Sequence, residues 1–250
     1  MTPLVRTTLR LAMLAWLLAS CSRPSGDAAP MPDVSSTART SPASAPAGPA
    51  APTFKESNAP PADRVGVLAP NTGIPAGQRV PDVQGLDLDG KDVTLSSLYK
   101  KGPILLAFYR GGWCPYCSGE IHALTLAFPE YQRRGITPVA VSVDRPDAEA
   151  KTTATFAIPF PVLSDSDAAI IEAFHVVKKV GEDEFTKMKG FGVDLESYSG
   201  KAHHEMAIPA LFLIDRTGVV RWAHSDPDFK VRPSTAQILA AIDAAHLGGT

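Results

Sequence analysis

The sequence predicts an α/β fold in which a mixed central sheet is covered by helices on both faces. Short apolar runs alternate with amphipathic stretches from about residue 65 onward. The run 104–109 is apolar throughout, which is typical of a central strand buried on both faces. Within 121–131, apolar side chains recur at spacings of three and four, as they do on one face of a helix. We therefore expect one globular domain over residues 65–250.

Strands are expected wherever a short apolar run is bounded by turn residues. Residues 86–95 hold the dipeptide Asp89-Gly90 between two such runs, which predicts a β-hairpin. Ser96 is then placed to cap a short helix that ends at Tyr99. The other expected strands are 104–109, 139–143, 162–163, 210–214 and 219–222.

Helices are expected between these strands. Pro129 lies inside a helical pattern that follows Pro115, so it should kink or divide that helix. Ser234 and Gln237 have the spacing of a capping box at the start of the last helix. Residues 177–206 contain four glycines and mixed charges, and we expect a solvated excursion rather than a functional lid. The remaining expected helices are 147–156 and 168–174.

Composition excludes several classes of protein. The chain of 250 residues has a net charge of −2 at pH 7, which gives no case for nucleic-acid binding. Hydrophobic residues at 44 % and charged residues at 20 % suit a globular protein. Three cysteines are too few for a disulfide scaffold, and their odd number means that at least one needs its own explanation.

The N-terminal segment 1–20 accounts for one cysteine. Arg6 and Arg10 precede the apolar run 11–19, which has the length of a signal peptide and is too short to span a bilayer. The run ends in small residues before Cys21, a pattern that resembles the signal of bacterial lipoproteins. That resemblance implies lipidation of Cys21 and a membrane-anchored protein of the cell envelope, periplasmic in a Gram-negative cell. The alternative is an ordinary secretory signal with a coincidental cysteine.

Residues 21–64 are predicted to be a disordered linker. Pro, Ala and Ser make up 26 of the 43 residues that follow Cys21. Such a stretch buries too little apolar surface to offset the ordering of its backbone. We expect it to act as a spacer between the membrane and the globular domain.

The two remaining cysteines form the motif Trp113-Cys114-Pro115-Tyr116-Cys117 between a predicted strand and a predicted helix. A cysteine at a helix N-terminus faces unpaired N–H groups and the positive end of the helix dipole, which lower its thiol pKa. Pro115 suits the first turn because it has no N–H to leave unpaired. This context favours a redox-active pair that cycles between dithiol and disulfide. A static disulfide and half of a metal site are the alternatives.

Several further stretches accompany the cysteine motif. They are Val80-Pro81-Asp82, the segments 89–95 and 108–117, Ala140-Val141-Ser142-Val143-Asp144, and the segments 160–165 and 212–218. With these stretches, residues 80–230 resemble the peroxiredoxin family, the alkyl hydroperoxide reductase and thiol-specific antioxidant group, within the thioredoxin fold. The resemblance is strongest to the peroxiredoxin-like branch that carries a Cys-x-x-Cys pair. It implies a thioredoxin-like fold, a thiol-based reaction and no cofactor.

The sequence also departs from the family pattern, in which Thr-x-x-Cys supplies a polarising hydroxyl and the peroxide-attacking thiol. Cys114 stands at the position of the Thr, and Cys117 stands at the position of the attacking Cys. Where the family places a supporting Arg, this chain has Ile208-Pro209-Ala210, and Pro209 resembles the cis-proline that faces the disulfide in thioredoxins. Arg110 is a candidate source of positive charge, although a surface position fits it equally well.

These residues define the candidate site and leave one question open. Position at the tip of the helix favours Cys114 as the attacking thiol, whereas the family alignment favours Cys117. Trp113 is expected to shield the thiols and Tyr116 to shape access to them. Only Cys114 and Cys117 are available for a disulfide within the domain, because no third cysteine lies there.

The resemblance implies a thiol peroxidase that reduces hydrogen peroxide or organic hydroperoxides and is reset by an external, thioredoxin-like dithiol. The alternative is a membrane-anchored thiol–disulfide oxidoreductase that acts on protein disulfides. A more remote alternative is a copper carrier that uses the Cys pair with His203 or His204. A surface location is the simpler expectation for both histidines.

Overall fold

The computed structural model describes residues 59–247, and all structural statements below concern that range. The predicted signal peptide, Cys21 and most of the predicted linker lie outside it. Residues 59–64, the last part of that linker, contact the globular domain. A short 3-10 helix spans Ala62–Arg64, the Arg64 guanidinium pairs with Asp226 at 3.1 Å, and Gln237 donates a hydrogen bond to the Pro60 carbonyl. The domain therefore includes residues N-terminal to the predicted boundary.

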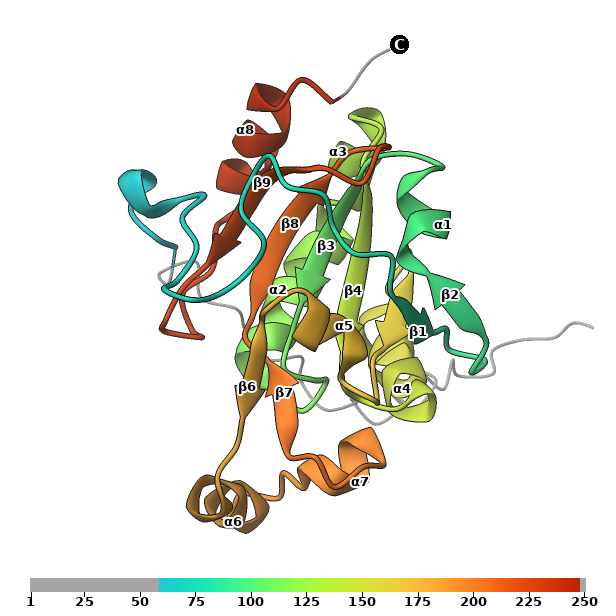
Figure 1. The fold of residues 1–250 in the computed structure, drawn as a ribbon, viewed down its shortest axis with the longest axis vertical. Helices are drawn as coiled ribbons and strands as arrows, with labels where there is room; N and C mark the ends of the chain where they lie inside the picture. Colours follow the sequence, from blue (N-terminus) through green and yellow to red (C-terminus); the bar gives the residue numbers. More distant parts are fainter. Residues whose placement is uncertain (1–58, 248–250) are drawn as a thin grey trace, which may run out of the picture. The chain divides into compact units, whose positions relative to one another are not determined.

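A seven-stranded sheet in the order β2-β1-β5-β4-β3-β8-β9 forms the centre of the domain (Figure 1). The contacts between β3, β4 and β5 are parallel and the other contacts are antiparallel, as expected of a mixed sheet. The strands are β1 Gln84–Leu86, β2 Asp92–Thr94, β3 Ile104–Phe108, β4 Thr137–Ser142, β5 Val162–Ser164, β8 Ala210–Ile214 and β9 Val220–Ser225. The predicted strands are confirmed, with ends that differ by up to three residues.

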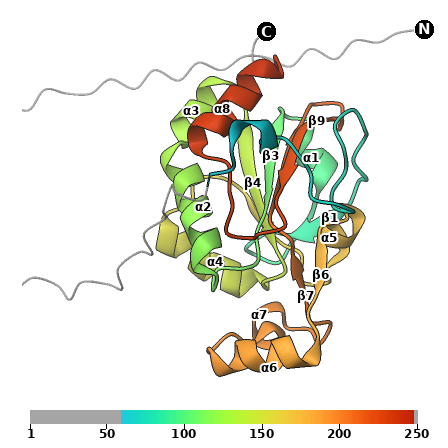
Figure 2. The same cartoon turned by 90° about the vertical axis from the view of Figure 1, so that its left-hand side faces the viewer.

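Helices cover both faces of this sheet. Figure 2 shows α2, α3, α4 and α8 on one side and α1 and α5 on the other. Central strand β3 contributes Leu106 and Phe108 to one core, and Leu105 and Ala107 to the other. The helices are α1 Leu95–Tyr99, α2 Pro115–Leu126, α3 Phe128–Arg133, α4 Pro146–Phe156, α5 Ala169–Ala173 and α8 Thr235–Ala244. A continuous apolar run at 104–108 is thus explained by burial on both faces.

Local signals account for most helix ends. Pro129 has no N–H to donate, and the helical pattern divides at Ala127 into α2 and α3. The capping box at the start of α8 is present, with Ser234 and Gln237 bonded to each other's backbone. The expected cap by Ser96 is wrong, because α1 begins one residue earlier. Asp82, from a distant segment, instead accepts the Ser96 N–H at 3.0 Å.

The segment 177–206, expected to be a solvated excursion, has its own secondary structure. Strands β6 Val177–Lys179 and β7 Glu205–Ala207 form a two-stranded antiparallel ribbon. This ribbon carries α6 Glu182–Gly190 and α7 Leu195–Ser199 (Figure 1). Phe185 and Leu195 are buried, whereas most residues of α6 are exposed, so the expected solvation is confirmed for α6 and the helices and strands are the unexpected part. We call residues 177–206 the insert.

Candidate active site

The Cys-x-x-Cys motif lies where the central sheet meets α2. Strand β3 ends at Phe108, and a short loop then leads to Cys114, which is the N-cap residue of α2. Pro115 occupies the first turn, and the Cys114 carbonyl accepts the first helical hydrogen bond, from the Ser118 N–H at 2.9 Å. Both thiols are free and buried. The sequence context therefore places the two sulfurs at a helix N-terminus, as predicted.

The Cys114 thiol is acidic. Its pKa is lowered to about 6, chiefly because the Cys117 thiol hydrogen-bonds to the Cys114 thiolate. Burial opposes this shift, while the positive charge of Arg110 and the backbone N–H groups of Cys117 and Tyr116 support it. Cys114 is consequently ionised at neutral pH, although its side chain is only 2 % exposed.

The Cys117 thiol has the opposite character. Complete burial raises its pKa, and its hydrogen bond to the Cys114 thiolate raises it further. Arg232 lies 3.9 Å from its sulfur, and the Arg110 N–H donates to that sulfur at 3.4 Å. These two groups favour the Cys117 thiolate, although burial outweighs them. The pair is thus one ionised thiol beside one protonated thiol.

Sequence reasoning missed the buried ion pair behind Cys117. Arg232 is only 4 % exposed, and its Nε donates to Glu120 Oε2 at 2.9 Å. One signal was available: Glu120 follows Cys117 by three residues and therefore shares its helix face with the apolar Ile121 and Leu124. An acid on such a face needs a buried partner. Nothing local marks Arg232, which reaches the site from the segment before α8.

Arg110 lies in an aromatic environment beside the thiols. Its guanidinium carbon is 4.3 Å from the ring centroid of Phe229 and 5.2 Å from that of Trp113. Its Nε also contacts the Met206 sulfur at 3.3 Å. Cation–π contacts of this kind hold the charge in place near the site. The structure thus puts the predicted positive charge next to Cys114.

Two glycines allow the loop before Cys114 to lie against the buried Asp144. The Asp144 carboxylate accepts the Gly112 N–H at 2.9 Å and the Trp113 Nε1–H at 3.3 Å. A Cβ on Gly111 would overlap the Trp113 indole and Asp144, and a Cβ on Gly112 would overlap the Thr152 hydroxyl. Burial raises the pKa of Asp144 to about 7. The indole of Trp113 is therefore fixed by a buried acid rather than left free.

A second buried acid lies behind this loop. The Glu149 carboxyl bonds to the hydroxyls of Tyr109 and Ser142. Burial, together with the neighbouring Asp144 charge, raises the pKa of Glu149 to about 8. The buried acids Asp144 and Glu149, with their hydrogen-bond partners, thus lie beneath the active-site loop.

Tyr116 and Pro209 occupy the surroundings of the thiols. The Tyr116 ring packs edge-on against Phe229, with 5.6 Å between the centroids. Pro209 immediately precedes β8, whose first residue, Ala210, is paired with Phe108 of β3. It therefore lies at the same end of the sheet as the Cys114 loop. The resemblance to a cis-proline is wrong, because every described peptide bond, that of Pro209 included, is trans.

The two candidate histidines have other partners. His203 lies between the Ser166 carbonyl and the Glu205 N–H, and His204 stacks on Phe185 at 3.9 Å. Within residues 59–247, no group of three or more His, Cys, Asp or Glu side chains lies together in a way that could hold a metal ion. The described residues therefore give the copper-carrier alternative no site.

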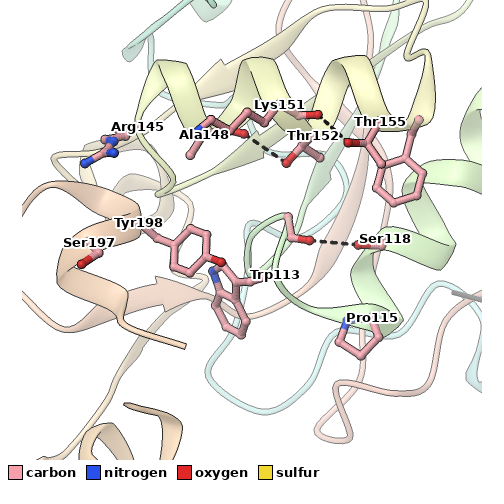
Figure 3. A pocket seen from close by; sticks show the side chains of 12 residues that line it. Trp113, Pro115, Ser118, Arg145, Ala148, Lys151, Thr152, Thr155, Ser197 and Tyr198 are labelled. Atoms are coloured by element: carbon pink, nitrogen blue, oxygen red, sulfur yellow. Dashed lines mark hydrogen bonds between the residues drawn. The ribbon is translucent and has the colours of Figure 1, made fainter. Parts of the chain in front are cut away.

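A cavity of about 540 Å³ opens next to the loop that carries Cys114, although neither cysteine lines it (Figure 3). Trp113 and Pro115, the two neighbours of Cys114 in the chain, form part of its wall. Helix α4 forms a second wall, and α7 of the insert forms a third through Ser197 and Tyr198. The insert thus lines part of the cavity next to the active-site loop, which the sequence did not indicate.

Residues 76–223 match the model of the AhpC/TSA family. This match covers more than half of the chain and includes both thiols of the site. The chain belongs to the AhpC/TSA family. The domain has the thioredoxin-like fold of the peroxiredoxins.

Curated relatives include the thiol-disulfide oxidoreductase ResA of Geobacillus thermodenitrificans and that of Bacillus subtilis. The first is 30 % identical over 106 residues, which are 42 % of this chain and 60 % of that protein. The second is 30 % identical over 111 residues, 44 % of this chain and 61 % of that protein. The matched region thus spans about three-fifths of the length of these relatives.

Solved structures with the same fold include peroxidoxin BcpB of Mycobacterium tuberculosis, at 22 % identity and a TM-score of 0.53. That likeness covers 70 % of this chain and 97 % of BcpB. Reduced Prx3 of Vibrio vulnificus, in complex with hydrogen peroxide, is 18 % identical with a TM-score of 0.56. It covers 68 % of this chain and 99 % of Prx3. At these identities the likeness shows the fold.

No helix within residues 59–247 is long and apolar enough to cross a membrane. Lipidation of Cys21 and a signal peptide over 1–20 stay predictions, because those residues lie outside the described range.

Proposed function

We propose that this AhpC/TSA-family protein reduces peroxides, with Cys114 as the attacking thiol and Cys117 as the resolving thiol. The observation that carries this proposal is the asymmetry of the pair: a Cys114 thiol with a pKa of about 6 beside a buried, protonated Cys117 thiol. A thiolate is the nucleophilic form of cysteine, so Cys114 is ready to react at neutral pH. The alignment with other family members favours Cys117, and the electrostatics favour Cys114.

The reaction proceeds in three steps. The Cys114 thiolate attacks one oxygen of the peroxide, the O–O bond breaks, and the other oxygen leaves and takes a proton as water or an alcohol. The Cys117 sulfur then attacks the Cys114 sulfenic acid, the S–O bond breaks, and water leaves as the disulfide forms. Finally, an external dithiol supplies two electrons and two protons through a mixed disulfide and becomes oxidised itself.

Arg232 has a defined part in the second and third steps. Cys117 must lose its proton to attack the sulfenic acid, and it leaves as a thiolate when a reductant opens the disulfide at Cys114. In both events negative charge develops on a buried sulfur 3.9 Å from the guanidinium. A pre-positioned cation stabilises such a charge without reorganisation. Arg232 therefore takes the supporting role for which this chain lacks the usual family Arg.

Burial of the thiols supports a small oxidant over a protein disulfide. Cys114 is 2 % exposed and Cys117 is fully buried. A hydrogen peroxide molecule is close in size to water, whereas a protein disulfide must bring a sulfur into line with the attacking thiolate. The exchange step with a reductant accordingly requires the loop before Cys114 to open.

Thiol–disulfide exchange is the second candidate function. The ResA relatives carry the name of that activity, and the acidic Cys114 beside a resolving Cys117 suits it as well. Cys114 then attacks the disulfide of a substrate and Cys117 resolves the mixed disulfide. In either case we propose that a lipid on Cys21 anchors the protein in the cell envelope, outside the cytoplasm.

One experiment separates these functions. The full chain carries Cys21→Ser throughout, so that the assays count only the thiols of the pair, and is compared with its Cys114→Ser and Cys117→Ser variants. We expect Cys117→Ser to form one sulfenic acid per chain with hydrogen peroxide, rapidly and without turnover, and Cys114→Ser to react no faster than free cysteine.

Two outcomes decide against peroxide reduction. Oxidation of the unsubstituted pair at the rate of free cysteine rules it out. Fast reduction of a mixed disulfide that is lost only in Cys114→Ser, together with slow peroxide oxidation, establishes thiol–disulfide exchange instead.

A further inference from the structure

The cavity next to the active-site loop is much larger than hydrogen peroxide requires. Its volume of about 540 Å³ falls within the range of sites that hold small organic molecules. One water molecule occupies roughly 30 Å³ in the liquid. The cavity therefore has room for the organic part of a reactant in addition to the reacting group.

Its lining has a definite chemistry. Trp113, Pro115 and Phe156 provide apolar and aromatic surface, and Arg145 and Lys151 provide positive charge. No carboxylate belongs to the lining. The Arg145 guanidinium is shared with Asp147, at 2.6 Å, which lies outside the lining. The lining is therefore apolar with some hydroxyl groups, and its two cations outnumber the one neighbouring carboxylate, Asp147. Such a cavity is complementary to an amphipathic molecule with a carboxylate.

The position of the cavity connects it to the reaction. Trp113 and Pro115 flank Cys114 in the chain and also line the cavity. Figure 3 shows α4 on one side, with Arg145 and Lys151, and Tyr198 of α7 directed toward Trp113. The Tyr198 and Trp113 ring centroids are 6.2 Å apart, and the Tyr198 carbonyl accepts the Arg145 N–H at 2.8 Å. Neither cysteine belongs to the lining, so a molecule held there contacts the loop that carries Cys114 and reaches the thiol when this loop opens.

We propose that this cavity binds a carboxylate-bearing small organic molecule that reacts with the thiol pair. This inference rests on the proposed function, because that function supplies the reaction. The same chemistry has two sources: the organic part of a hydroperoxide, which leaves as an alcohol, or a small thiol that reduces the disulfide. In the second case two thiol molecules become one disulfide, and their two electrons and two protons return Cys114 and Cys117 to the thiol state.

The test compares charged and neutral reactants. In the oxidant arm, linoleic acid hydroperoxide is compared with its methyl ester. In the reductant arm, 3-mercaptopropionate is compared with 2-mercaptoethanol as the reagent that opens the disulfide. Each arm uses the full chain with Cys21→Ser, its Lys151→Gln and Arg145→Gln variants, and Lys101→Gln as the matched control. Lys101 is an exposed lysine outside the lining.

We expect Lys151→Gln to lower the acid-to-neutral ratio of second-order rate constants about fivefold in one arm, which identifies the source. Arg145→Gln lowers the same ratio, and Lys101→Gln leaves it unchanged. Equal loss for acid and neutral reactants, or no change of the ratio in either arm, overturns the inference. Hydrogen peroxide, which is too small to need the cavity, reports on the proposed function separately: a rate no better than free cysteine overturns that function instead.

Discussion

The guanidinium of Arg232 lies 3.9 Å from the sulfur of Cys117, and both groups are buried. The cation is held there by Glu120, and the neutral thiol lies between this ion pair and the acidic Cys114. An isolated buried charge lowers the free energy of unfolding strongly, so Arg232 depends on its partner Glu120. The thiol site in turn depends on this ion pair, because Cys117 packs against it.

This dependence predicts that a single variant loses much more unfolding free energy than the matching double variant. Glu120→Leu leaves Arg232 buried without its partner and should lower the free energy of unfolding by about 3–5 kcal/mol. Replacement of both residues, by Glu120→Leu with Arg232→Met, should recover much of that loss because no charge stays buried. Urea unfolding of the reduced protein measures both effects. A double variant that is less stable than the single one contradicts this interpretation.

The double variant also tests the role of the cation in the reaction. Without Arg232, negative charge on Cys117 is no longer stabilised, so disulfide formation should slow after the sulfenic acid has formed at Cys114. We expect sulfenic acid to accumulate and to be captured by dimedone. Initial oxidation of Cys114 should change little, because Arg232 is not among the groups that lower its pKa.

Reactivity should follow the ionisation of Cys114. Its pKa of about 6 predicts a rate with peroxide that rises as pH increases through 6 and is level above about pH 7. Arg110→Gln removes a positive charge and should raise this pKa, whereas Lys230→Gln, a cation near Tyr116, serves as the control. Thiolate absorbance at 240 nm against pH measures the shift. Half-ionisation near pH 9 in the unsubstituted protein contradicts the assignment.

Burial of Glu149 should make stability fall with rising pH. Its pKa is about 8 in the folded protein and near 4.5 when the chain is unfolded, so the folded state binds more protons between these values. Stability is therefore fully present below about pH 4.5 and is lost as pH rises through about 8. We expect Glu149→Gln to reduce the loss of unfolding free energy between pH 5 and pH 8. Glu184→Gln, at an exposed ion pair, should leave that loss unchanged.

Close packing of the active-site loop predicts a steric effect at Gly112. Gly112→Ala places a Cβ against the Thr152 hydroxyl and should cost about 1–3 kcal/mol while displacing Cys114. Thr152→Ala in the same chain removes the clashing oxygen and should restore part of the activity. Gly181→Ala is the control, since a Cβ there meets nothing within 4 Å. Equal effects of Gly112→Ala and Gly181→Ala contradict the steric account.

Sequence reasoning succeeded where the determining interactions are local. The Asp89-Gly90 turn, the break before Pro129 and the Ser234 capping box each depend on a few adjacent residues. The position of Cys114 at a helix N-terminus follows in the same way from a buried strand, a proline and a helical pattern.

Its failures involve contacts between distant segments. Arg232 reaches Cys117 across 115 residues of sequence, so no spacing reveals it. Asp82 displaces Ser96 as the helix cap because the chain returns close to α1. The helices of the insert were not predicted because its glycines and charges suggest a loop, whereas burial of Phe185 and Leu195 stabilises them. The expectation of a cis peptide bond at Pro209 came from family analogy, and a shared family does not determine the geometry of a single peptide bond.

The insert enters and leaves the domain at neighbouring points, since Val177 is paired with Ala207. A segment with adjacent ends can be lengthened, shortened or exchanged without a change in the path of the rest of the chain. Its helix α7 forms one wall of the cavity, whereas Cys114 caps α2 and Cys117 lies within that helix. Evolution is thereby free to alter what enters the cavity separately from the chemistry, and an engineer has the same freedom.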